Sequence, residues 1–303
     1  MPYAWTHILF GNHVIKQANL PEPQNRPFFQ LGCQGPDFLF FHRFWPWIKD
    51  DRVSRLGDLF HTCHCGPVLM DLIDAAKSVP TLQDYVAGFV THHILDRTAH
   101  PYIHYRAGYQ KFKHQRLEVA IDTLVAKNLK NIEVWRTSVV PEIDIGHELP
   151  PELAETLHQV SCKYYPEAAG ELQPHEYSAA YRDMKKALRL FFDPWGIKWL
   201  LTLGKIQPFR HSKRIPSRDF LNINQNMWTH PAVPEETHNE SFWDLWEMAV
   251  AEGKSILTNV YHYWENGGKE TRETLAEQIG DRSYDTGKDC SLNLVNRLSD
   301  PLV

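Results

Sequence analysis

The sequence predicts an all-α protein, and three observations support this. Apolar residues recur with the roughly 3.6-residue period of amphipathic helices almost throughout the 303 residues. No segment keeps the strict alternation of apolar and polar residues that marks a half-buried strand, and there is no internal repeat. Hydrophobic residues make up 43% and charged residues 23%, which is ordinary for a globular chain. We therefore expect helices packed around a substantial core.

In the first half, threonines and prolines set the predicted limits of the helices. Thr6 and Thr81 are of a residue type that favours helix N-caps. Gly66-Pro67 separates two helices, and Pro101 should end a helix at His100, because proline disfavours helical dihedrals in the residue before it. The predicted helices cover residues 6–18, 55–65, 67–77, 81–100 and 111–130, and the segments 20–27 and 32–38 are predicted loops.

In the second half, which follows a proline-rich joint at 141–151, we expect further helices and one irregular excursion at 205–240. The excursion carries basic residues that could contact a phosphate head group, although a solvated loop is the alternative: Arg210, Lys213, Arg214 and Arg218. Most of the ten tryptophans lie in the second half, including Trp195 and Trp199, and we expect most of them in the core, while one or two could line a cleft. The predicted helices cover 151–165, 175–192, 194–204, 241–265 and 271–280.

Composition excludes several classes of protein. The 32 basic and 37 acidic residues argue against a dedicated nucleic-acid scaffold but allow a local basic patch. Five cysteines do not suggest a disulfide framework. The N-terminus lacks the features of a signal peptide, and the apolar run at 194–206 is too short to span a bilayer. We therefore expect a cytoplasmic protein without a transmembrane segment.

Histidines and carboxylates at helical spacing point to metal binding. His92 and Asp96 are four residues apart on one apolar face of the helix predicted at 81–100, so their side chains converge. His114 and Glu118 repeat the spacing on the next helix, and His7 lies on the apolar stripe of the first. Each pair alone could be a surface salt bridge, and a single buried histidine is commonly a hydrogen-bonded core residue. Two such pairs within a short stretch favour a metal site.

Other metal-capable residues stay open or are set aside. His93 and His104 could be ligands. We do not expect three other histidines to bind metal: His13, His42 and His64. Cys63 and Cys65 form a C-x-C motif beside His61, but no second cysteine pair follows. We therefore expect a helix core there rather than a cysteine-ligated metal.

With these residues, the sequence resembles the zinc-dependent phospholipase C family, which is related to the S1/P1-type nucleases. The order and types of the family's ligands match at His7, Asp37, His61, His92, Asp96, His100, His114 and Glu118. The resemblance implies one zinc ion surrounded by Asp37, His61, His92 and Asp96, and a second held by His100, His114 and Glu118. It further implies a third zinc ion bound by His7 and bridged by Asp96.

The resemblance departs from the family at the N-terminus, where the secreted enzymes bind zinc through a processed N-terminal tryptophan. Here the sequence begins Met1-Pro2 and Trp5 is internal, so we expect two tightly bound zinc ions and a possible weaker third. The resemblance implies a multi-helix phospholipase C/P1 nuclease-like bundle with additional C-terminal helices. We expect a single all-α domain over 1–303, with the metal-binding core at about 1–140 and a C-terminal helical extension at about 141–303.

The function predicted in this way is zinc-dependent hydrolysis of a phosphodiester, like that of phospholipase C, with a metal-activated water and with Asp37 as a general base. The substrate would be a phosphate ester such as a phospholipid head group, and peripheral membrane contact is possible. An S1/P1-like nuclease is one alternative, so nucleic acid is not excluded as a substrate. The other alternative is a metal-binding interaction protein that has lost turnover.

Overall fold

The computed structural model describes residues 4–303 and confirms the all-α prediction, since its only sheet in that range is a hairpin of two short antiparallel strands. The helices and strands are α1 (Ala4–Gln17), α2 (Arg26–Gly32), η1 (Asp37–Phe41), α3 (Arg52–Thr62), α4 (Cys65–Ser78), η2 (Pro80–Leu82), α5 (Gln83–Ala107), α6 (Lys113–Lys130), α7 (Val140–Ile143), α8 (Pro151–Tyr164), α9 (Pro166–Ala169), α10 (Pro174–Phe191), α11 (Ile197–Leu201), η3 (Gln207–Phe209), β1 (Trp228–Thr229), β2 (Thr237–His238), α12 (Phe242–Asn266), α13 (Lys269–Ile279) and η4 (Cys290–Leu292). The η elements are 3-10 helices.

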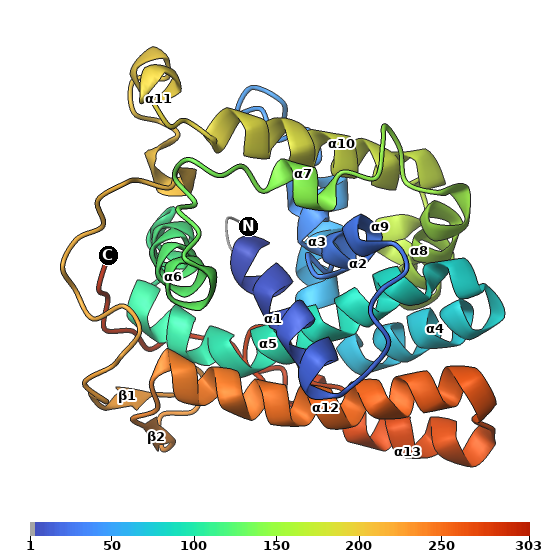
Figure 1. Ribbon diagram of the computed structural model, residues 1–303. Coiled ribbons are helices and arrows are strands. Elements are labelled where there is room, and N and C mark those ends of the chain that lie inside the picture. The colour runs from blue at the N-terminus through green and yellow to red at the C-terminus, as the bar shows by residue number, and fades with distance from the viewer. Residues whose placement is uncertain (1–3) are drawn as a thin grey trace.

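Helix α5 runs through the centre of the molecule and is buried on nearly every side (Figure 1). Helices α1, α2, α4, α6 and α12 pack against it. A helix surrounded in this way has apolar residues all round instead of one apolar stripe. The polar side chains that α5 does carry are therefore held away from water, which makes each of them a candidate for a function.

The predicted helices are mostly found within a few residues of their expected limits, with four corrections. Helix α1 includes Thr6, whose hydroxyl and backbone N–H both donate to Asp122 Oδ1 at 2.7 Å, so Thr6 is not an N-cap. Thr81 lies inside η2. Helix α2 was not predicted, although Asn25 accepts a hydrogen bond from the N–H of Phe28 as a helix N-cap does.

The largest correction concerns Pro101, which lies inside α5 and does not end it. A proline in a helix interior removes the hydrogen bond to the carbonyl four residues earlier, here that of Arg97. The backbone of Gly287 packs against this carbonyl: a Cβ atom added to Gly287 would lie 2.3 Å from the Arg97 oxygen. The turn of α5 that contains Pro101 is therefore covered by the C-terminal segment at the point where the helix continues past the proline.

The C-terminal segment returns to the centre of the fold after α13. The N–H of Tyr284 and the hydroxyl of Ser283 both donate to the carbonyl of His61 at the end of α3. The N–H groups of Asp300 and Leu302 donate to carbonyls near the end of α5, on Tyr105 and Arg106. The segment thus covers one side of α5. Among residues 4–303, no helix combines the length and apolar character needed to cross a bilayer.

Candidate metal centre

Helix α5 presents His92, Asp96 and His100 at intervals of four residues, so all three side chains fall on one face. They are almost completely buried, with exposed fractions of 0%, 1% and 2%. The prediction that Pro101 ends the helix at His100 is wrong, because α5 continues to Ala107. His100 is therefore placed by the same helix as the other two side chains.

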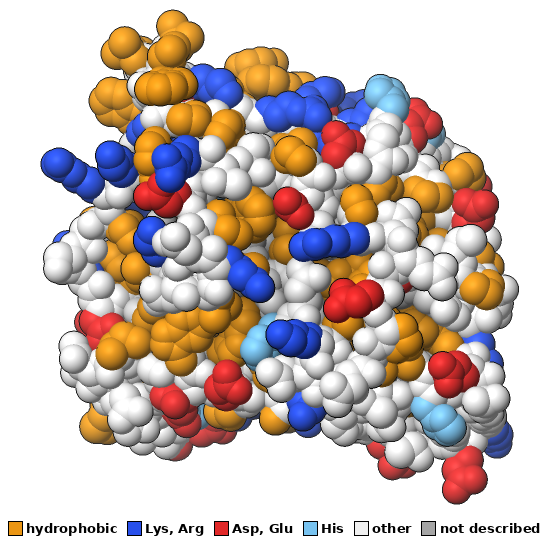
Figure 2. Space-filling view, in the orientation of Figure 1, with side chains coloured by type: hydrophobic (Ala, Val, Ile, Leu, Met, Phe, Trp, Pro, Cys, Tyr) orange, Lys and Arg blue, Asp and Glu red, His pale blue; other side chains and the backbone are white. Residues whose placement is uncertain are grey.

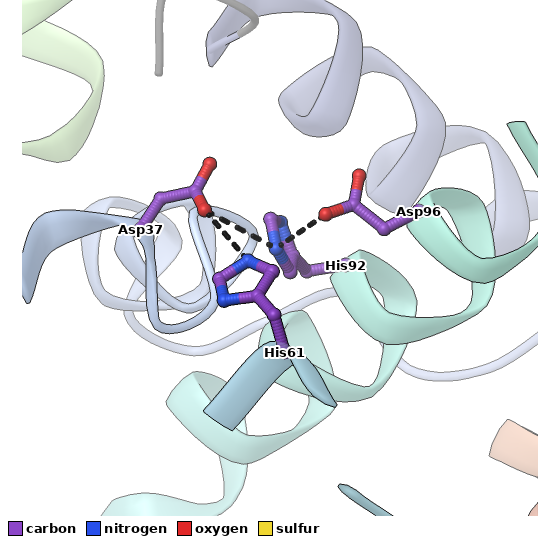
Figure 3. Close-up of side chains that lie close together, drawn as sticks. All are labelled: Asp37, His61, His92 and Asp96. Atoms are coloured by element: carbon purple, nitrogen blue, oxygen red, sulfur yellow. Dashed lines mark hydrogen bonds and ion pairs between the residues drawn. The ribbon is translucent and has the colours of Figure 1, made fainter. Parts of the chain in front are cut away.

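Four predicted ligands lie together in the first group, formed by Asp37, His61, His92 and Asp96 (Figure 3). One potential ligand atom from each lies within 4.8 Å of the others. Asp37 Oδ1 lies 3.1 Å from His61 Nε2 and 3.9 Å from His92 Nε2, and His92 Nε2 lies 3.1 Å from Asp96 Oδ2. The four residues come from η1, α3 and α5, and Figure 3 shows their polar ends pointing toward one another.

Local structure orients the ligands of this group. Gly35, at φ +52°, turns the chain between α2 and η1 so closely over His92 that a Cβ there would lie 2.1 Å from the imidazole. The Nδ1 atoms of His61 and His92 lie 2.7 Å from Gly57 O and 3.1 Å from Cys33 O. If Nδ1 donates to these carbonyls, the Nε2 atoms that face the carboxylates are available as metal ligands.

The second group consists of His100, His114 and Glu118, the other predicted set. Glu118 Oε1 lies 3.0 Å from His114 Nε2 and 3.7 Å from His100 Nε2. Glu118 is 1% exposed on α6 and its second oxygen is buried without a hydrogen-bond partner in the described part of the chain. The carbonyl of Tyr284 lies 3.2 Å from His100 Nδ1, which again leaves Nε2 directed at the carboxylate.

Asp96 connects the two groups, because its two oxygens face different partners. Oδ2 lies against His92, whereas Oδ1 lies 3.2 Å from His7 Nε2 and 3.5 Å from His100 Nε2. Both Asp96 oxygens and His92 Nε2 are buried, and none makes a well-aligned hydrogen bond within residues 4–303. Burying a carboxylate in this way is costly unless a cation compensates it. The residues therefore fit divalent metal ions.

The electrostatics of the two groups favour ionised carboxylates. Burial alone would raise the pKa of Asp96, but the nearby His100, His92 and His7 hold it well below its ordinary value. The same balance of burial against His114 and His100 lowers the pKa of Glu118. Such carboxylates remain charged at neutral pH and are suited to cations.

The pKa values of two histidines move the other way. Burial opposes protonation of His61, but the hydrogen bond and charge of Asp37 outweigh it and raise the pKa to about 9. For His100, burial is outweighed by Asp96, Glu118 and Asp285, which raise the pKa to about 10. A metal would therefore displace protons from both rings.

Two further metal-capable residues lie near the second group: Asp285, which was not predicted, and His104, which the sequence left open as a ligand. Asp285 Oδ1 lies 3.5 Å from His104 Nε2 and 3.7 Å from His100 Nδ1, so these three residues form a further set of metal-capable atoms. His104 continues the four-residue spacing of α5, a signal that ending the helix at His100 concealed. Asp285 lies in an irregular segment far along the chain, where no pattern in the sequence marks it.

The remaining candidates lie outside the first two groups. His93 Nε2 lies 2.9 Å from Arg282 O, and its ring packs against Tyr284 at 4.5 Å between centroids. Cys65 forms a separate metal-capable group with Asp281 and Cys290, whose sulfur lies 3.6 Å from that of Cys65. This group includes neither Cys63 nor His61. The proposed bystanders belong to none of the metal-capable groups formed by residues 4–303: His13, His42 and His64.

Comparison with known proteins agrees with the geometry. No curated protein and no solved structure gave a significant match. Residues 6–170, more than half of the chain, match the family model described as zinc dependent phospholipase C. This range includes α5, α6 and all eight predicted ligands. The chain therefore belongs to the zinc-dependent phospholipase C family.

Proposed function

We propose that the protein is a zinc-dependent phosphodiester hydrolase that acts like a phospholipase C. The observation that carries the proposal is the position of Asp96, whose oxygens face two groups of buried nitrogen and oxygen ligands. Histidine and carboxylate ligands suit zinc. Two ions would be held tightly, one in each group. A weaker third ion beside His7 stays a prediction, since Met1–Tyr3 lie outside the described residues.

In this proposal, the two groups hold zinc, and Asp37 has a second task as a base. Zinc held by the two groups would neutralise charge on a phosphoryl group and lower the pKa of a bound water. Asp37 is the proposed general base: burial raises its pKa, but His61 and His92 outweigh burial and keep it ionised. The backbone carbonyls of Gly57, Cys33 and Tyr284 hold the imidazole rings in orientation.

Metal analysis combined with a substrate panel tests the proposal. The purified protein should contain zinc and hydrolyse a soluble phosphorylcholine ester or a phospholipid in a metal-dependent way. Asp37→Asn should lower the turnover number by about 100-fold or more, because it removes the proposed general base and also weakens a zinc ligand of the first group. Preferential cleavage of single-stranded nucleic acid would show a nuclease instead. Zinc binding without cleavage of any phosphodiester would show a metal-binding protein without turnover.

A further inference from the structure

An apolar projection stands out from the body of the protein at α11 (Figure 1). We call residues 195–203 the α11 tip. It carries five large apolar side chains that are mostly exposed: Trp195 at 87%, Ile197 at 60%, Leu200 at 67%, Leu201 at 77% and Leu203 at 85%. Figure 2 shows hydrophobic side chains gathered on this projection. Trp199 is also 41% exposed, so the expectation that most tryptophans lie in the core does not hold for these two.

The base of the α11 tip, where it joins the rest of the protein around Asp193, is fixed by hydrogen bonds and ring stacking. The exposed apolar side chains of the tip therefore have an ordered backbone beneath them. The Asp193 carboxylate accepts hydrogen bonds from the backbone N–H groups of Lys198 and Trp199, at 3.2 and 2.9 Å. The Asp193 carbonyl accepts one from Arg210 Nε. Phe191 and Phe209 stack below with centroids 4.7 Å apart. Several large apolar side chains exposed together in an ordered segment typically mark an interaction site.

The charge around the α11 tip indicates the kind of partner. Residues 194–218 contain six Lys and Arg residues and no Asp or Glu, in a chain whose net charge is −5. Lys205, Lys213 and Arg214 are exposed and form no ion pair with a carboxylate of the described chain. Tryptophan and aliphatic side chains beside unpaired cations suit a bilayer that contains anionic phospholipids. In a symmetric dimer, the same cations would face each other and repel.

A second exposed aromatic surface lies beside the same base. Trp47 is 72% exposed and Ile48 is 38% exposed, and the Trp47 ring stacks on Trp45 at 5.1 Å between centroids. Phe44, next to Trp45, contacts Phe191 at 6.4 Å. Phe191 is also the ring that stacks beneath the α11 tip. The two exposed apolar surfaces thus share one end of α10.

We propose that the α11 tip, together with Trp47, docks the protein onto membranes that contain anionic phospholipids. The apolar side chains would enter the interfacial layer while Lys205, Lys213 and Arg214 face the phosphates. The α11 tip lies outside the stretch matched by the family model, which ends at residue 170, whereas Trp47 lies within it. Docking goes beyond the proposed hydrolysis and does not depend on it, because it requires no reaction.

Vesicle flotation tests the proposal with the full-length, zinc-loaded protein. It should bind phosphatidylcholine vesicles that contain phosphatidylglycerol, bind pure phosphatidylcholine vesicles more weakly, and lose affinity as salt rises. The double variant Leu200→Ser/Leu201→Ser should bind at least about tenfold more weakly, because two side chains would no longer enter the lipid. The matched control is Met227→Ser/Met248→Ser, since these exposed residues, at 71% and 55%, lie outside the α11 tip. It should bind like the wild type.

Variants in which two basic residues are replaced by glutamate provide a second test. Lys205→Glu/Arg214→Glu should abolish the preference for anionic vesicles, whereas Lys130→Glu/Lys254→Glu, at exposed positions on α6 and α12, should preserve it. The proposal is overturned if the wild type binds neither kind of vesicle, if the α11-tip variant binds like the wild type, or if the tip supports only self-association. Hydrolysis of a soluble phosphodiester is measured separately. A protein that docks but hydrolyses nothing would refute the proposed function and leave docking intact.

Discussion

Replacing Asp96 with asparagine is the sharpest test of the metal centre, because its two oxygens face both ligand groups. Asparagine keeps the shape of aspartate but removes its charge, and one oxygen becomes an NH2 group that cannot bind a metal. In the structure, Oδ2 faces His92, and Oδ1 faces His7 and His100. Whichever way the amide is turned, one side loses its oxygen ligand and the other keeps only a neutral one.

The size of the effect follows from the number of ligands. Structural zinc sites bind with roughly 10–16 kcal/mol shared among four ligands, or about 3 kcal/mol for each. Losing about 3 kcal/mol weakens zinc binding roughly 100-fold. Because Asp96 faces both groups, the loss affects two ions and not one. We therefore expect Asp96→Asn to lower the zinc content by more than one equivalent and to abolish phosphodiester hydrolysis.

The assay is zinc content after dialysis, measured beside hydrolysis and a circular dichroism spectrum that shows the fold is intact. His13→Ala is the control, because His13 lies on α1 but in none of the metal-capable groups of residues 4–303, and it should change neither quantity. If Asp96→Asn retained full zinc content and wild-type hydrolysis, the bridging role would be refuted. The residues would then be a buried polar network.

Three further predictions test the same centre. Glu118→Gln should remove about one equivalent of zinc, measured by metal analysis, because Glu118 belongs to the second group only; loss of both ions would contradict this. Zinc affinity should rise by up to about tenfold per pH unit for each site between about pH 6 and 8.5. The reason is that zinc must displace protons from His61 and His100, whose pKa values are raised to about 9 and about 10. Competition with a chelator measures the affinity, and an affinity that does not change with pH would show that both rings are already neutral. Two equivalents should survive extensive dialysis; three, counted by metal analysis, would contradict this and point to a further ligand such as His93 or His104.

The helical ligand pairs could be predicted from sequence because they depend on local geometry. Residues four apart on an α-helix share a face whatever surrounds them, so His92 and Asp96 could be paired from their spacing. The same holds for His114 and Glu118. The apolar residues on those faces predicted burial, and both carboxylates are 1% exposed. Asp37 and His61, which no helical spacing connects to the others, were found only through the family resemblance.

What could not be predicted depends on contacts between distant segments. Pro101 should end a helix by its own local preference, yet α5 continues past it with Gly287 packed against the affected turn. Asp285 approaches His100 and His104 because the segment after α13 folds back over α5. Neither contact leaves a periodic signal, since each joins a helix to an irregular segment nearly 200 residues away.

The continuation of α5 past Pro101 explains how a single helix can serve both ligand groups. Each four-residue step advances about 6 Å along a helix axis, so His92, Asp96, His100 and His104 form a row along one face. Asp96 falls between the first group and the second, where its two oxygens can be divided between them. The segment that packs on the proline turn also places Tyr284 O against His100 Nδ1. Ser283 and Tyr284 of the same segment also donate to the His61 carbonyl. A substitution at Gly287, far outside the stretch matched by the family model, should therefore disturb both groups, the second through His100 and the first through His61.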